Sequence, residues 1–171
     1  IYFSEELGNG VYNAEIYKYD SVAVWPLHET LTDTTVVFDK ERLVTLDFKK
    51  SIYLEGRFFL QTQHINHQVD QKDIFNLSYN PDQEVEKDDD GQRIYNLYLR
   101  VTQEGGTGDS TKWINTTAFT IDKFLDQAKA IESREGQNEI NFKINYAERY
   151  NADTTACVWG ATDVFTLRFT N

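Results

Sequence analysis

The chain has 171 residues, of which 40% are hydrophobic and 14% aromatic, and its formal net charge is −11. This length suits one domain with its own core, and the apolar content is too high for a disordered chain. The acidic balance argues against nucleic acids and anionic membrane surfaces as partners, because both are negatively charged. We therefore expect a single folded domain over residues 1–171.

The N-terminal end of the sequence bears on where the protein works. No apolar run approaches the ~20 residues that a transmembrane helix needs, and no signal-peptide core is present. The sequence begins at Ile1 and contains no Met, so we expect that an upstream segment was removed, either an export leader or a flexible tail.

Alternation of apolar and polar residues predicts strands along most of the chain. We expect about nine to eleven strands separated by turns, as in an all-β fold. Gly56 interrupts one candidate and predicts a bulge or a bend there. In chain order the candidates are residues 1–4, 14–19, 21–25, 34–38, 44–49, 51–61, 73–79, 95–102, 113–119, 139–146, 154–159 and 165–170.

One segment has the spacing of a helix instead. Its apolar residues recur every three or four positions and form a single stripe, which predicts a helix over about 120–133. Thr120 suits the N-cap, and Gly136 follows the end. We expect this helix to lie across a sheet or to plug the end of a sandwich. The stripe consists of Ile121, Phe124, Leu125, Ala128 and Ile131.

Residues 84–91 (EVEKDDDG) crowd acidic side chains just ahead of a strand. A calcium loop of the EF-hand type would use the carboxylates of Glu86, Asp88 and Asp90. The position that needs a bidentate carboxylate is Leu97, so the set of calcium ligands is incomplete. Asp and Gly favour tight turns, and we therefore predict that this stretch turns the chain and holds no metal.

Residues 61–73 (QTQHINHQVDQKD) hold two of the three histidines and lack an apolar stripe, which predicts a polar loop. His64, His67 and Asp70 would form a metal site only if this loop folded back on itself. The glycine-rich residues 105–111 also predict a loop.

No combination of residues with catalytic spacing is present. The chain lacks the nucleophile elbow, the zinc-protease helix and the phosphate-binding loops, so we expect a protein that is not an enzyme and carries no cofactor. Cys157 is the single cysteine, which excludes an internal disulfide. Its small or apolar neighbours predict a thiol buried in a strand.

Aromatic residues near strand and loop ends are the best candidates for ligand contacts. Trp25, Trp113 and Trp159 lie near the ends of predicted strands or loops, and Tyr98 points away from the core face of its strand. A flat ring exposed beside Asn, Gln and Asp suits a sugar, whose C–H face is apolar and whose hydroxyls form hydrogen bonds. Rings at strand ends also serve as lids on a core, and both interpretations stay open.

The composition and the opening residues of the sequence resemble those of a known class of proteins. The opening IYFSEE, the abundant Asn, Asp, Tyr and Thr and the acidic balance are similar to uncharacterised cell-envelope lipoproteins of Bacteroidetes-type bacteria. This resemblance implies an immunoglobulin-like sandwich attached outside the cell by a lipid anchor upstream. It also implies proximity to glycan-uptake machinery.

Together these features predict an all-β, two-sheet antiparallel sandwich of immunoglobulin type with one helix. The alternative is a closed β-barrel of lipocalin type, which would enclose a small ligand. For function we expect an exported, non-catalytic binding module at the cell surface or in the periplasm, with a glycan or a protein as partner. The alternatives are a structural, adhesin-like surface subunit and a lipocalin-like carrier, and the oligomeric state is not readable from the sequence.

Overall fold

The computed structural model describes residues 2–15, 21–30, 41–47 and 50–170. Within these ranges the chain forms strands and one helix, so the prediction of a mostly β protein with a single helix is confirmed. The predicted strand at 34–38 and part of the one at 14–19 lie outside the described residues. The elements are β1 (Tyr2–Gly8), β2 (Val11–Glu15), β3 (Val24–Glu29), β4 (Thr45–Leu46), β5 (Ile52–Leu54), β6 (Arg57–Val69), β7 (Lys72–Tyr79), β8 (Glu86–Lys87), β9 (Arg93–Glu104), β10 (Thr107–Thr120), α1 (Asp122–Arg134), β11 (Glu139–Tyr150), β12 (Cys157–Ala161) and β13 (Phe165–Arg168).

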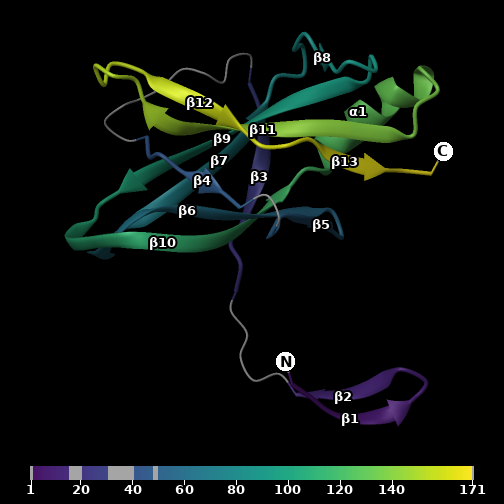
Figure 1. Cartoon of the computed structure of the whole chain (residues 1–171), viewed down its shortest axis with the longest axis horizontal. Coiled ribbons are helices and arrows are strands. Elements are labelled where there is room, and N and C mark those ends of the chain that lie inside the picture. The colour runs from purple at the N-terminus through teal and green to yellow at the C-terminus, as the bar shows by residue number, and fades with distance from the viewer. Residues whose placement is uncertain (1, 16–20, 31–40, 48–49, 171) are drawn as a thin grey trace.

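A long antiparallel ribbon, folded back on itself, forms the centre of the protein (Figure 1). In its first half β6 pairs with β10, from Arg57 opposite Thr120 to Val69 opposite Thr107. In its second half β7 pairs with β9, starting with Lys72 opposite Glu104. Because β6 runs directly into β7 and β9 into β10, the ribbon bends at residues 69–72 and 104–107. We call this bend the corner.

Strand β3 joins the two halves of the ribbon along one side. Its first residues pair in parallel with β10, and its last residues pair in parallel with β7. Strands β11, β12 and β13 extend the sheet beyond β9. The result is one 11-stranded sheet curled into a half-barrel, while β1 and β2 form a separate hairpin.

This curled sheet changes the predicted architecture. The immunoglobulin-like arrangement of two separate antiparallel sheets is not confirmed, because β3 connects the layers through parallel pairing that the sequence pattern does not reveal. The barrel-like alternative is supported in part by the curl of the sheet. Alternation identifies which face of a strand is buried, but it does not show how the strands are ordered.

Residues 41–47 cross the side of the half-barrel that β3 leaves open. The backbone N–H of Arg42 donates to the carbonyl of Val101 in β9, and that of Val44 donates to Ala147 in β11. The side chain of Val44 is buried in the core. This crossing segment fills the gap that opens where β9 and β11 diverge.

Aromatic side chains fill the concave side of the sheet. Phe58 packs edge-on against Phe142 and Phe165, with ring centroids 5.4 and 4.8 Å apart. The predicted inward faces of the strands at 95–102 and 139–146 are buried as expected. Cys157 is half-buried in β12, and burial raises the pKa of its thiol. The buried residues of β9 and β11 are Ile94, Tyr95, Leu97, Leu99, Val101, Ile140, Asn141, Phe142, Ile144 and Ala147.

Helix α1 closes one end of the half-barrel. Phe124 packs edge-on against Tyr79, Tyr95 and Phe142. The predicted N-cap is wrong by one residue: Ile121 occupies the cap without a side-chain hydrogen bond, and the Thr120 hydroxyl donates to the carbonyl of Trp25. In the described residues no helix is both long and apolar enough to cross a bilayer.

Two predicted loops are strands in the structure. Residues 61–69 belong to β6 and residues 107–111 to β10, because the two segments pair with each other. The inward positions of β6 include Thr62 and His64, so the apolar alternation that would identify the strand is missing. At Glu55 and Gly56 the chain reverses between β5 and β6, with positive φ at both residues, so the bend expected at Gly56 is a hairpin turn.

The acidic stretch 84–91 turns the chain as predicted. Asp88 Oδ1 accepts the backbone N–H groups of Asp90 and Gln92, which closes the turn between β8 and β9. Gly91 has φ +77°, a left-handed conformation that glycine adopts without strain. Glu86 is bound to Lys143 at 2.7 Å. The carboxylate of Asp88 therefore stabilises the turn.

Candidate functional site

The corner depends on glycine. Asp70 and Gly105 face each other where the ribbon bends, both with positive φ. A Cβ added at Gly105 would lie 2.4 Å from the carbonyl oxygen of Asp70, which is closer than any real contact. The ribbon can therefore bend here only because residue 105 has no side chain.

The side chain of Gln71 ties the strands together beside the corner. Its Oε1 accepts the backbone N–H of His67 at 2.7 Å. Its Nε2 donates to Asp73 Oδ1 at 2.7 Å and to the carbonyl of Ile65 at 3.3 Å. All polar atoms of this amide are used, so Gln71 has a fixed position.

A pocket of about 480 Å³ opens next to Gln71. Trp113 forms one wall, and its side chain is 52% exposed, although it lies directly opposite the buried His64 in the β6–β10 pairing. The other lining side chains carry amide, imidazole, carboxylate or hydroxyl groups. We call this the corner pocket, and it is lined by Asn66, His67, Asp70, Gln71, Thr111 and Trp113.

A buried contact between His64 and Asp73 supports the corner pocket from behind. His64 Nε2 lies 2.9 Å from Asp73 Oδ2 and links β6 to β7 across the bend. Burial raises the pKa of Asp73, but the hydrogen bonds from His64 and Gln71 outweigh it, so the pKa lies below its ordinary value. In the part of the chain that the structure describes, no group of His, Cys, Asp and Glu is arranged to hold a metal.

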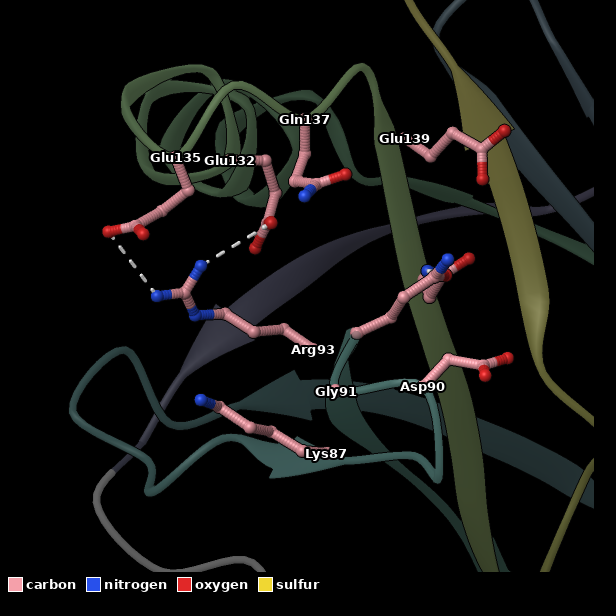
Figure 2. Close-up of a pocket in the computed structure, with 10 residues that line it drawn as sticks. Lys87, Asp90, Gly91, Arg93, Glu132, Glu135, Gln137 and Glu139 are labelled. Atoms are coloured by element: carbon pink, nitrogen blue, oxygen red, sulfur yellow. Dashed lines mark hydrogen bonds and ion pairs between the residues drawn. The ribbon is translucent and has the colours of Figure 1, made fainter.

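A second pocket, of about 170 Å³, lies where α1 ends beside the β8–β9 turn; we call it the helix-end pocket (Figure 2). Arg93 extends between Glu132, at 3.6 Å, and Glu135, at 3.5 Å. The Tyr95 hydroxyl donates to Glu132 Oε1 at 2.6 Å. Burial, followed by the adjacent Glu132 carboxylate, raises the pKa of Tyr95. The contacts of Arg93 and Tyr95 with the two glutamates tie the end of α1 to β9, so this cluster anchors the helix.

The structure separates the four aromatic residues singled out in the sequence. Tyr98 and Trp159 meet edge-to-face on the outside of the sheet, with ring centroids 5.9 Å apart. Arg100 places its guanidinium 5.9 Å from the centroid of the Trp159 ring. Trp113 lines the corner pocket, whereas Trp25 packs beside Phe75 at 6.4 Å. Only Tyr98 and Trp159 contact each other.

The sequence does not show which polar residues line the pocket together with Trp113. Asn66 and Gln71 come from β6 and the corner, whereas Thr111 and Trp113 come from β10, about forty residues later in the chain. The β6–β10 register brings them together by placing Thr111 opposite Asn66. No local pattern carries this information.

Comparison with known proteins identifies a fold but no family. No family model and no curated protein matches the chain. An uncharacterised protein from Parabacteroides merdae matches at 22% identity and a TM-score of 0.67, over 86% of this chain and 66% of its own. A candidate lipoprotein from Bacteroides fragilis matches at 15% identity and a TM-score of 0.54, over 88% and 71%.

These similarities show a shared fold and nothing finer, because all the identities are low. A protein of unknown function from Bacteroides vulgatus matches at 16% identity and a TM-score of 0.49, over 99% of this chain and 68% of its own. The chain spans just under two thirds of the Parabacteroides merdae protein. Each of these solved proteins is thus longer than the chain described here.

Proposed function

We propose that this protein is a non-catalytic, exported cell-envelope module that binds a carbohydrate in the corner pocket. The observation that carries the proposal is the half-exposed ring of Trp113 in a pocket whose other walls are polar. A sugar ring needs both surfaces at once, because its C–H face stacks on an aromatic ring while its hydroxyls form hydrogen bonds.

The size and the rigidity of the corner pocket support this proposal. Ligand pockets usually enclose ~300 to 1,000 Å³, and the corner pocket has about 480 Å³. The hydrogen bonds of Gln71 fix one wall in place, and the β6–β10 pairing fixes Trp113. A preformed wall reduces the entropy that binding must overcome.

The cell-envelope part of the proposal is supported by similarity in fold. The Bacteroides fragilis protein with the same fold is a candidate lipoprotein, and the Parabacteroides merdae protein also comes from a Bacteroidetes bacterium. A lipid anchor outside the printed sequence would place the corner pocket at the cell surface or in the periplasm.

A lipocalin-like carrier role has less support. Such a carrier encloses its ligand in the interior of the barrel. Here the concave side of the sheet is occupied by Phe58, Phe142 and Phe165, whose rings contact one another. The corner pocket, by contrast, lies at the bend of the ribbon.

A structural, adhesin-like role is the second candidate. Ile65 and Ile114 are 47% and 56% exposed and lie diagonally opposite on the outer face of the β6–β10 pair. Such an apolar pair suits contact with another protein. Light scattering tests this role: a stable oligomer that Ile65→Lys disrupts would support it, and a monomer at all concentrations would count against it.

A titration of the protein with a panel of polysaccharides tests carbohydrate binding. Calorimetry and tryptophan fluorescence measure the binding. We expect Trp113→Ala to weaken binding at least about tenfold, or ~1.4 kcal/mol, because the stacking face is lost. Ile114→Ala is the matched control, since this exposed neighbour points to the other face of the strand. Equal binding by wild type and Trp113→Ala, or no binding across the panel, would refute the proposal.

A further inference from the structure

The imidazole of His67 has a defined hydrogen-bonding direction. Its Nδ1 lies 3.1 Å from the backbone carbonyl oxygen of Gly108. A carbonyl oxygen only accepts hydrogen bonds, so Nδ1 must carry the proton in this contact. In the neutral ring Nε2 is then an acceptor, and it has no partner among the described residues. His67, a residue that lines the corner pocket, therefore has a hydrogen-bond acceptor that the described residues leave unused.

Asp70 offers a second acceptor. Its side chain is exposed at the corner and has no hydrogen bond or ion pair with the described residues. Its backbone is held at φ +56°, which costs an ordinary residue free energy and is tolerated best by Asp and Asn. An ionised carboxylate donates no hydrogen bond.

Gln71 cannot balance these acceptors with donors. Its amide nitrogen already donates to Asp73 and to Ile65, and its oxygen already accepts from His67. Among the lining side chains only Asp70 carries a formal charge, so the formal charge of the pocket is −1 with neutral histidine. Asn66, Thr111 and the indole of Trp113 can donate hydrogen bonds, so the lining distinguishes ligands by their charge and disfavours a ligand that carries negative charge.

We infer that the corner pocket selects a neutral sugar unit and rejects uronic acids and sulfated sugars. The sugar hydroxyls donate to His67 Nε2 and to the Asp70 carboxylate, while its C–H face lies on Trp113. An anionic sugar would meet Asp70 at close range in a protein whose net charge is −11. This inference rests on the proposed carbohydrate binding and names its substrate class.

The test compares matched neutral and acidic oligosaccharides, galacto-oligosaccharides against oligogalacturonates and manno-oligosaccharides against oligomannuronates. We expect the full chain to bind the neutral member of each pair at least about tenfold more tightly at low salt. The preference should narrow near 1 M salt, where the screening length falls to ~3 Å.

Asp70→Asn isolates the charge, because Asn tolerates the same left-handed backbone. It should reduce the preference for neutral sugars several-fold, whereas Asp89→Asn, an equal charge change in the exposed β8–β9 turn, should leave it unchanged. Binding of acidic sugars that equals or exceeds that of neutral ones and requires Trp113 would overturn this inference but keep the proposed function. Absence of any Trp113-dependent binding would overturn both.

Discussion

The corner pocket and the helix-end pocket use polar residues in opposite ways. In the helix-end pocket, Arg93 pairs with Glu132 and Glu135, and Tyr95 donates to Glu132, so these four side chains bind one another (Figure 2). In the corner pocket, the acceptors of His67 and Asp70 have no partner among the described residues, and the ring of Trp113 is half exposed.

This difference indicates that the helix-end pocket stabilises the fold, whereas the corner pocket, as we propose, binds a ligand. Glu132 is only 4% exposed, and an unpaired charge at that depth would be costly, so its partners are needed for folding. Asp70 is exposed, and its side chain has no partner among the described residues to lose on mutation. Changes at the helix end should therefore reduce stability, and changes in the corner pocket should reduce binding.

Phe124→Ala should give the largest loss of stability. The ring is 1% exposed and packs between Tyr79, Tyr95 and Phe142, so its removal leaves a cavity under the helix. We expect the free energy of unfolding to fall by about 3–5 kcal/mol in urea titration. Carbohydrate affinity, measured well below the melting temperature, should not change.

The control for this variant lies on the same helix. Ile131 is 39% exposed, and Ile131→Ala should cost less than about 1 kcal/mol. If Phe124→Ala abolished sugar binding while the protein remained folded, the assignment of stability to the helix end and of binding to the corner pocket would be wrong.

Gly105→Ala should have the next largest effect, and it connects the two regions. A methyl group at residue 105 collides with the carbonyl of Asp70 and also disfavours φ +66°. We expect a loss of about 2–3 kcal/mol in the free energy of unfolding, and weaker sugar binding as well, because Asp70 moves.

Comparison with Gly91→Ala shows how much of the loss in Gly105→Ala comes from the steric collision and how much from backbone strain. The φ of Gly91 is +77°, but no atom lies within 4 Å of the added Cβ, so only the conformational cost of about 1–2 kcal/mol applies. Equal losses in Gly91→Ala and Gly105→Ala would show that the contact with Asp70 contributes nothing.

The Asp73–His64 pair predicts how the corner responds to acid. The pKa of Asp73 is lowered in the folded protein, so its contribution to stability is complete above its ordinary value of 3.8 and is lost as the pH falls through the lowered value. Asp73→Asn should cost about 1–2 kcal/mol at neutral pH and should flatten the dependence of stability on pH below about 4.

Urea titrations from pH 6 down to pH 3 measure this slope for wild type and variant. Asp82→Asn is the control, since this exposed carboxylate lies in the loop after β7. A wild-type acid limb that Asp73→Asn leaves unchanged would remove Asp73 as its source.

The sequence predicted local structure well wherever one face of an element was apolar. The strands around Leu97 and Phe142 show the expected buried faces, and the helix shows it around Phe124, whereas Ile131, predicted in the same stripe, is 39% exposed. Strand β6 was missed beyond Gln61, because its inward positions include Thr62 and His64. These polar groups are buried between layers, and nothing in the local pattern indicates that burial.

The long-range arrangement of the strands could not be predicted from the sequence, for a different reason. The bend of the ribbon depends on Gly105 fitting against Asp70, and the corner pocket depends on the register that sets Thr111 opposite Asn66. Both are pairings between segments far apart in the chain. Trp113 was selected as an aromatic residue near a strand end, but its polar neighbours only become visible in the folded ribbon.

Trp113→Ala should have the smallest effect on stability. Its ring is 52% exposed, so we expect a loss of about 1 kcal/mol or less in urea unfolding, against ~3–5 kcal/mol for Phe124→Ala. One variant removes an aromatic ring from under α1 and the other removes one from the wall of the corner pocket, so they compare the two regions directly. The effects on carbohydrate binding should have the opposite order: Trp113→Ala should lose binding, and Phe124→Ala should keep it. A stability loss at Trp113 as large as that at Phe124 would instead make Trp113 part of the core, and its exposure would no longer point to a ligand.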